Sequence, residues 1–246
     1  FWSSIRNTFA FTLGAIVIQT PLALLLALVL NNRKLTGRNL YRVLIFLPVV
    51  TTTAVIGIVF VILLNPWAPG AINAGLTDTG IVDMPVNFLG DAATALPTIV
   101  AIDIWKDLGV ILVYWLAALQ TIPQDIYDSA AVDGVNRWQK LRHVTLPMIA
   151  PLGVIILLLV TVRSFNAFDI VWAMTQGGPN LATDIVQTYI YRFAFHPDVV
   201  TPRMGFASAA AIIFGVLVML IAALQGVVLR RIRGRKAADT AGAGGA

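Results

Sequence analysis

The sequence predicts an all-α membrane protein: a polytopic bundle of transmembrane helices with a helical hairpin on its cytoplasmic side. The chain of 246 residues is 58% hydrophobic and only 12% charged, whereas an ordinary soluble domain is about a quarter charged. Its mean hydropathy is +0.84. The apolar residues form runs of about 20, the length that a helix needs to cross a bilayer, and these runs lack the alternation of barrel strands. Composition and run length therefore predict spanning helices.

Five apolar runs are predicted as spans of a single transmembrane domain, residues 1–236. None is predicted to be a cleavable signal, because the runs are too long and too many. Residues 237–246 are predicted to form a flexible cytoplasmic tail. The five spans lie near residues 6–30, 43–64, 93–119, 148–174 and 205–229.

The Lys and Arg residues predict the orientation of these spans. Twelve of the seventeen lie in residues 31–42, 137–142 and 230–236, which share one side of the membrane if the spans alternate. The positive-inside rule makes that side cytoplasmic, so the chain is expected in the cell membrane with its C-terminus inside. Phe1 would then lie outside, and we expect a further span before it. The basic end is expected to contact anionic lipid rather than nucleic acid.

Two segments are predicted as external loops. Residues 65–91 and 175–203 are rich in Gly, Pro and Asp and nearly free of Lys and Arg. Turn residues of this kind punctuate loops. Within the second loop, the amphipathic piece 184–195 is expected to lie on the membrane interface.

Residues 120–151, between the third and fourth spans, read QTIPQDIYDSAAVDGVNRWQKLRHVTLPMIAP. They are too polar for lipid and too rich in helix formers for a slack loop. Thr121 and Gln124 fit a capping box, with a proline in the first turn. Gly134 breaks the run, and a second helical piece follows at 136–143. Two interpretations stay open from these residues alone: docking of the hairpin to a partner, or packing on the chain's own spans.

The segment DSAAVDGVNRWQKLRHVTLP (128–147) resembles the "EAA" loop of bacterial ABC importer permeases, whose pattern is E-A-A-x-x-D-G-A with a closing Leu-Pro. Two positions depart from it: Asp128 replaces the family Glu, and Ser129 replaces the first Ala. The segment WAMTQGGPNLATD (172–184) is similar to the T-x-G-G-P-x-x-x-T segment of the first permease subunit in carbohydrate importers of the maltose and glycerol-3-phosphate type. Shorter matches lie at 42–48, 69–76 and 104–107.

This resemblance implies the type I ABC importer permease fold and its assembly. A second permease subunit would share the pathway, two cytoplasmic ATPase subunits would bind ATP and Mg²⁺, and an external solute-binding protein would deliver a sugar. The loop 121–146 would dock in an ATPase cleft, and closure of the ATPase dimer would rock the spans between inward- and outward-facing states. The residues assigned to this coupling are Asp128, Ser129, Ala130, Ala131, Asp133, Gly134, Val135, Trp138, Arg142, Leu146 and Pro147.

The chain itself is expected to be no enzyme and to bind no cofactor. It has no G-x-x-x-x-G-K-[ST] phosphate loop, so ATP hydrolysis would belong to the partner subunits. His143 and His196 are predicted on opposite sides of the membrane, where they cannot share a metal ion. The chain shows no grouping of nucleophile, base and orienting residue.

Polar residues inside spans predict the solute path, because they are costly in lipid and face a cavity or a partner. Asp103 and Asp107 share a face of the third span, and Lys106 is expected to pair with Asp103. On the fourth span, three polar residues at i+3 spacing share a face, the last being Asp169. An ion-pair network that only holds the bundle together is the alternative. The predicted path consists of Asp103, Lys106, Asp107, Arg163, Asn166 and Phe168, with Trp105 and Phe165 as aromatic neighbours.

The mixed charge of this set favours a neutral sugar over a phosphate. Two other functions remain open. A proton- or sodium-coupled secondary carrier would use Asp103 and Asp107 as its coupling site, and inverted repeats would favour it. A membrane scaffold would use the hairpin only to recruit another protein.

Overall fold

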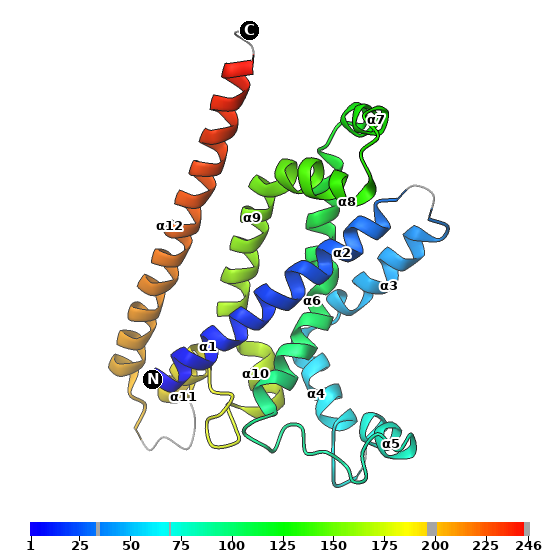
Figure 1. The fold of residues 1–246 in the computed structure, drawn as a ribbon. Coiled ribbons are helices and arrows are strands. Elements are labelled where there is room, and N and C mark those ends of the chain that lie inside the picture. The colour runs from blue at the N-terminus through cyan, green and yellow to red at the C-terminus, as the bar shows by residue number, and fades with distance from the viewer. Residues whose placement is uncertain (33–34, 69, 196–200, 244–246) are drawn as a thin grey trace.

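The computed structural model describes residues 1–32, 35–68, 70–195 and 201–243, with side chains as far as Arg231. These residues form α- and π-helices joined by turns, which confirms the predicted all-α class (Figure 1). Within the described part, three helical stretches are long and apolar enough to cross a membrane, and a sharply bent pair of helices adds a fourth. The candidate functional residues lie between these stretches or within the stretch Arg137–Thr175.

The first span is one continuous helix from Trp2 to Leu30. A π-helical segment, η1 (Ala15–Gln19), joins α1 (Trp2–Gly14) to α2 (Thr20–Leu30). Alanines in η1 and α2 let this span approach the rest of the bundle closely. Ala15, Ala23 and Ala27 are all fully buried. Small residues serve this purpose in membrane helices, where apolar side chains gain little by leaving lipid.

The predicted span at 43–64 is not one straight helix, and the structure corrects it. α3 (Arg38–Val50) and α4 (Thr53–Leu63) meet at an angle of 94°. Thr51 and Thr52 between them have extended backbones with ψ near 140°. Pro48 contributes no N–H to the last turn of α3, and the threonines that follow are β-branched and favour helix poorly. The hydropathy of this run concealed the break.

The centre of the bundle is α6 (Ala95–Gln120), which follows the short helix α5 (Ala71–Asp78). α2, α3 and α9 all pack against α6. Gly109 lets α3 lie against it directly, because a Cβ atom there would come 2.7 Å from the Ile45 carbonyl oxygen. On another face, Trp115 of α6 lies over Gly153 of α9.

The hairpin after α6 leads without interruption into the next span. The predicted helical piece at 136–143 and the predicted span at 148–174 belong to one stretch, Arg137–Thr175. A short break at Asn166 and Ala167, where the backbone leaves helical geometry, divides its last turns from the rest. The elements in order are α7 (Gln124–Val132), α8 (Arg137–Gln139), η2 (Lys140–Thr145), α9 (Leu146–Phe165) and α10 (Phe168–Thr175).

Two helices complete the chain. α11 (Val186–Phe195) is amphipathic, as predicted for the second external loop. α12 (Met204–Ala243) packs on α9 and α11. It runs past the predicted span end at Leu229 and through the first residues of the predicted tail; residues 244–246 lie outside the described residues.

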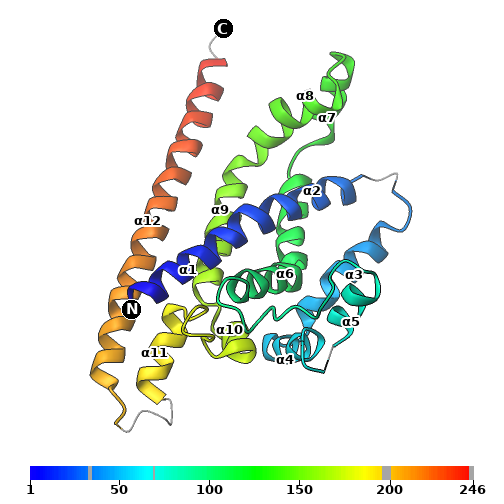
Figure 2. The ribbon, with the colours of Figure 1, turned by 60° about the horizontal axis from the view of Figure 1, so that its bottom comes forward.

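The loops sort to two ends of the molecule. Figure 1 shows α7 and the end of α12 at the top, and α5 and α11 at the bottom. Figure 2, turned by 60°, keeps α7 and α11 well apart. The segments predicted as cytoplasmic and external therefore lie at opposite ends.

Candidate functional site

The charged residues of the predicted solute path surround one cavity. It has a volume of about 190 Å³ and lies where α4, α6, α9 and α10 meet. Asp103, Lys106 and Asp107 of α6 are buried, although three charges so close would be costly to place in lipid. The structure thus brings together residues 60 positions apart in the chain. The lining is Thr53, Asp103, Lys106, Asp107, Arg163, Asn166, Ala167, Asp169 and Ile170.

The ion pairs of this cavity differ from the prediction. Lys106 pairs with its neighbour Asp107, with Nζ 3.0 Å from Oδ1, and not with Asp103. Arg163 lies between the two carboxylates: Nη2 is 3.5 Å from Asp103 Oδ1 and also contacts Asp107. One nitrogen of the guanidinium from α9 thus contacts both acids, while Lys106 is engaged by Asp107. Together with Asp169, the cavity holds three acids and two bases.

The two helix breaks open toward this cavity. Thr53 begins α4 directly after the 94° bend, and Asn166 lies at the break between α9 and α10. Asn166 Nδ2 donates to the Val162 carbonyl oxygen at 2.7 Å, and its Oδ1 accepts from Gln187 of α11 at 2.5 Å. Irregular backbone at membrane depth is tolerated where it lines a cavity or is buried in protein. The breaks therefore supply polar lining that straight helices would not.

Phe168 lies beside the cavity in an aromatic cluster. Its ring stacks on Trp172 with centroids 5.7 Å apart, and Tyr191 of α11 contacts both rings at 5.1 and 4.6 Å. Tyr191 was missed by the sequence analysis, although its position in the amphipathic piece 184–195 marked the segment. Phe168, Trp172 and Tyr191 form one aromatic cluster; none of them lines the cavity itself, but Phe168 lies between the lining residues Ala167 and Asp169 in the chain.

The two other predicted aromatic neighbours lie elsewhere. Trp105 is on the opposite face of α6 from Asp103 and packs edge-on against Phe60. Phe165 is buried between Phe9 and Phe214. The helical period explains both errors, since residues two positions from a cavity residue point away from it.

The segment at 172–184 is tied into a hydrogen-bond network with α1 and α11. Its last residue, Asp184, is buried and accepts hydrogen bonds from Ser4 of α1 at 2.7 Å and from Thr188 of α11 at 2.9 Å. Arg192 forms an ion pair with Asp184 at 2.8 Å. Within the segment, the Thr175 and Thr183 hydroxyl groups lie 2.7 Å apart. The motif residues thus fix the loop to α1 and α11, a role that the sequence analysis did not assign.

The hairpin bends at Gly134, as predicted. Gly134 has φ +71°, a left-handed conformation that glycine adopts without strain. The capping box is not at Thr121, whose hydroxyl donates to the Ala118 carbonyl oxygen at the end of α6. The box lies instead at Asn136 and Gln139, whose side chains bond each other's backbone N–H groups. At both sites a residue with a polar side chain is followed three positions later by Gln. The Thr121 hydroxyl is already bonded to the last turn of α6, so only the second site forms the box.

The hairpin presents an exposed tip. Val132 is 88% exposed and Trp138 is 67% exposed, which is unusual for apolar side chains on an otherwise polar hairpin. Of the eleven predicted coupling residues, Ala130 is buried and Val135 is half-buried. The exposed ones are Asp128, Ser129, Ala131, Asp133, Gly134, Trp138, Arg142, Leu146 and Pro147.

Comparison with known proteins gives consistent results. Residues 19–234 match the family "binding-protein-dependent transport system inner membrane component". The chain is 34% identical to a probable ABC transporter permease of Brucella suis over 86% of this chain and 70% of that protein. It is 32% identical to the lactose transport system permease LacF of Rhizobium radiobacter, over 92% of this chain and 74% of that protein.

Two further similarities concern sugars. The trehalose/maltose transport system permease MalF of Thermococcus litoralis is 32% identical, over 89% of this chain and 71% of that protein. Among solved structures, a bacterial ABC transporter that imports the acidic polysaccharide alginate has a chain that matches with a TM-score of 0.84 and 28% identity. That match covers 94% of this chain and 79% of the other.

Proposed function

Because this chain belongs to the family of binding-protein-dependent transport system inner membrane components, and is thus the multi-pass permease subunit of an ABC importer, we propose that it carries a neutral sugar or oligosaccharide. The observation that supports this cargo is the pairing of a polar cavity with an aromatic cluster at Phe168, Trp172 and Tyr191. Sugars bind through planar polar groups and ring faces. Relatives named for lactose and for trehalose/maltose point the same way.

The charge of the cavity distinguishes this cargo from an acidic one. Three acids against two bases leave the lining slightly negative, and both bases are engaged by acids. An alginate-like polyanion would meet repulsion here. We therefore assign Asn166 and Asp103 the polar contacts to a neutral sugar.

The cavity is too small to be a complete site. Its volume of about 190 Å³ lies below the roughly 300–1,000 Å³ of typical ligand pockets. A second permease subunit would supply the facing half of the pathway. The T-x-G-G-P loop, held by Asp184, supports assignment of this chain as the first-subunit type.

The hairpin with its exposed Val132 and Trp138 would be the docking element for a cytoplasmic ATPase. That partner would bind ATP and Mg²⁺ and perform the hydrolysis, since permeases of this family are not catalytic. The C-terminus and the hairpin would then face the cytoplasm, and α5 and the T-x-G-G-P loop would face the solute-binding protein. A scaffold or an ion-coupled carrier is not favoured, because the family is that of binding-protein-dependent transport systems.

A cysteine crosslink tests the docking. The chain has no cysteine, so Val132→Cys gives a single reactive site. With a co-expressed ATPase that carries one cysteine in its cleft, we expect a crosslink whose yield changes on addition of ATP. The matched control is Trp67→Cys, equally exposed at 88% but at the α5 end. Equal crosslinking of both variants, or none at Val132→Cys with a partner that co-purifies, would refute the docking assignment.

A further inference from the structure

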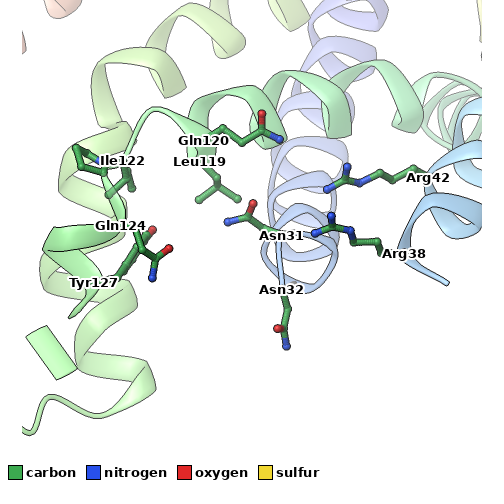
Figure 3. Close-up of a pocket in the computed structure, with 10 residues that line it drawn as sticks. Asn31, Asn32, Arg38, Arg42, Leu119, Gln120, Ile122, Gln124 and Tyr127 are labelled. Carbon is green, nitrogen blue, oxygen red and sulfur yellow. The ribbon is translucent and has the colours of Figure 1, made fainter. Parts of the chain in front are cut away.

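Two neighbouring hollows lie beside the hairpin, far from the ion-pair cavity. Their volumes are about 750 and 770 Å³, and both are lined by Asn32, Gln124 and Tyr127. Figure 3 shows the first of them: the guanidinium groups of Arg38 and Arg42 reach from α3 toward Asn31, with Gln124 and Tyr127 across the opening. None of the described lining residues is among the eleven assigned to ATPase coupling.

The hollows are strongly basic. Arg38 and Arg42 line the first, and Arg137 and Lys140 line the second, whereas no acid is among the described lining residues of either. The only hydrogen bond found for Arg42 in the described structure joins Nη2 to the Leu30 carbonyl oxygen at 2.9 Å; its buried Nε finds no partner there. A guanidinium placed in this way retains a donor for an anion.

The backbone adds to this positive potential. α3 has thirteen residues and begins at Arg38, so its first N–H groups and the positive end of its dipole lie at the first hollow. The first turn of α3 contains no acidic residue. α7 also begins here, at Gln124, but Asp125 in its first turn offsets its dipole. Arginine side chains and the N-terminus of α3 together favour a phosphate group.

The floor of the second hollow is apolar. Leu28 and Val29 of α2 and Leu141 of η2 line it, and Val29 is exposed on the side of a membrane-spanning helix. A free phosphate would gain nothing from these side chains. A phospholipid would place its headgroup among the basic residues and its acyl chains along α2. Basic pockets at the cytoplasmic end of transmembrane helices bind anionic lipid headgroups for this reason.

We propose that the two adjoining hollows between the start of α3 and the hairpin together bind the headgroup of an anionic phospholipid. The proposal rests on the orientation given above, which places the hairpin at the cytoplasmic face. It does not depend on the cargo or on the ATPase. A bound lipid would fill the space between the start of α3 and α7, and so would make the position of the hairpin sensitive to the composition of the membrane.

The test measures lipid retention by the purified full chain in mild detergent, using native mass spectrometry. We expect phosphatidylglycerol to be retained in preference to phosphatidylcholine. Since one Lys or Arg near an anionic surface contributes a factor of about five, Arg38→Gln and Arg137→Gln should each weaken retention about five-fold, and the double variant about twenty-five-fold. Arg38→Lys, which keeps the charge, should retain most of the binding.

Arg230→Gln is the matched control: it removes one charge from α12 on the same predicted side but outside the hollows, and should leave retention unchanged. Inorganic phosphate is the free-anion comparison, and it should not displace the lipid. Equal retention of the two lipids, full retention by the Arg38→Gln/Arg137→Gln variant, or displacement by phosphate would each overturn the proposal. Circular dichroism confirms that each variant is folded. Because no transport is measured, these outcomes leave the sugar-import proposal separately testable.

Discussion

Arg163 is the residue on which the charge balance of the ion-pair cavity depends. It comes from α9 and holds Asp103 and Asp107, both buried on α6. Two carboxylates one helical turn apart would repel each other without it. Lys106 is engaged by Asp107, so it cannot replace Arg163 at Asp103 without losing that pair. A single guanidinium therefore joins two helices at the cavity.

A double-mutant cycle measures this link. Arg163→Gln should lower the free energy of unfolding by about 1–3 kcal/mol, because it leaves the buried Asp103 without its ion-pair partner. Arg163→Gln combined with Asp107→Asn should cost less than the sum of the two single changes, since either change alone already removes the contact between Arg163 and Asp107. Thermal unfolding in detergent provides the values. The control pairs Arg163→Gln with Asp83→Asn, an exposed loop position, and should be additive; additivity in both pairs would mean that Arg163 and Asp107 do not interact.

The sequence predicted which charged residues would lie together at the cavity, but not which of them would form ion pairs with each other. The inner side of α6 had to hold Asp103, Lys106 and Asp107. Their spacing along a helix and the cost of exposing charge to lipid can both be read from neighbouring residues in the sequence. The partner of Asp103 is not local. It depends on how α9 lies against α6, so the i,i+3 pair with Lys106 was a reasonable but wrong choice.

Among the elements, local signals predicted turns well and failed at breaks inside apolar runs. Gly134 has the left-handed backbone that Asp-Gly indicates, because one residue decides a turn. The bend at Thr51 is different: the residues directly before and after it are apolar on both sides, and hydropathy carries no information on the direction of a helix. Only the packing of α3 on α6 and of α4 on α10 fixes the 94° angle.

The contact of α3 with α6 makes a prediction for Gly109. A Cβ atom there would lie 2.7 Å from the Ile45 carbonyl oxygen and 2.8 Å from the Phe46 Cα atom, and neither backbone atom can move alone. Gly109→Ala should therefore destabilise the fold by about 1–3 kcal/mol. Gly215→Ala on α12 is the control, because nothing lies within 4 Å of its added Cβ. Unfolding midpoints in detergent compare the two; an equal effect would show that the close approach is not required.

At the scale of the whole molecule, α12 is a large apolar surface that the rest of this chain does not cover. Only 6% of its most apolar window is buried, and Ile212, Met219 and Leu224 are all well exposed. Lipid and a second permease subunit would cover such a surface. The sequence predicted this apolar run, but hydropathy is the same for a helix face that contacts lipid and for one that contacts protein, so it does not predict which of the two covers α12.

The proposed orientation of the whole molecule is tested by labelling. Trp67→Cys near α5 and Trp138→Cys in the hairpin are both well exposed and lie at opposite ends. A membrane-impermeant maleimide should label Trp67→Cys in intact spheroplasts and Trp138→Cys only after permeabilisation. The positive-inside rule sets this expectation. The reverse pattern would invert the orientation, and labelling of both in permeabilised spheroplasts serves as the control.

The unbroken helix from Arg137 to the Asn166 break has a mechanical consequence. It turns in its first part, where η2 and two prolines lie, and then runs straight down the bundle (Figure 1). A bent helix of this kind would move as a rigid body, so a displacement of the short arm before the bend would rotate the long arm after it. From Pro151, the second of these prolines, to Arg163 the long arm measures about 18 Å at 1.5 Å per residue. The arm ends at the guanidinium that clamps Asp103 and Asp107, so force applied at the hairpin would be delivered to the cavity without any relay of intermediate contacts.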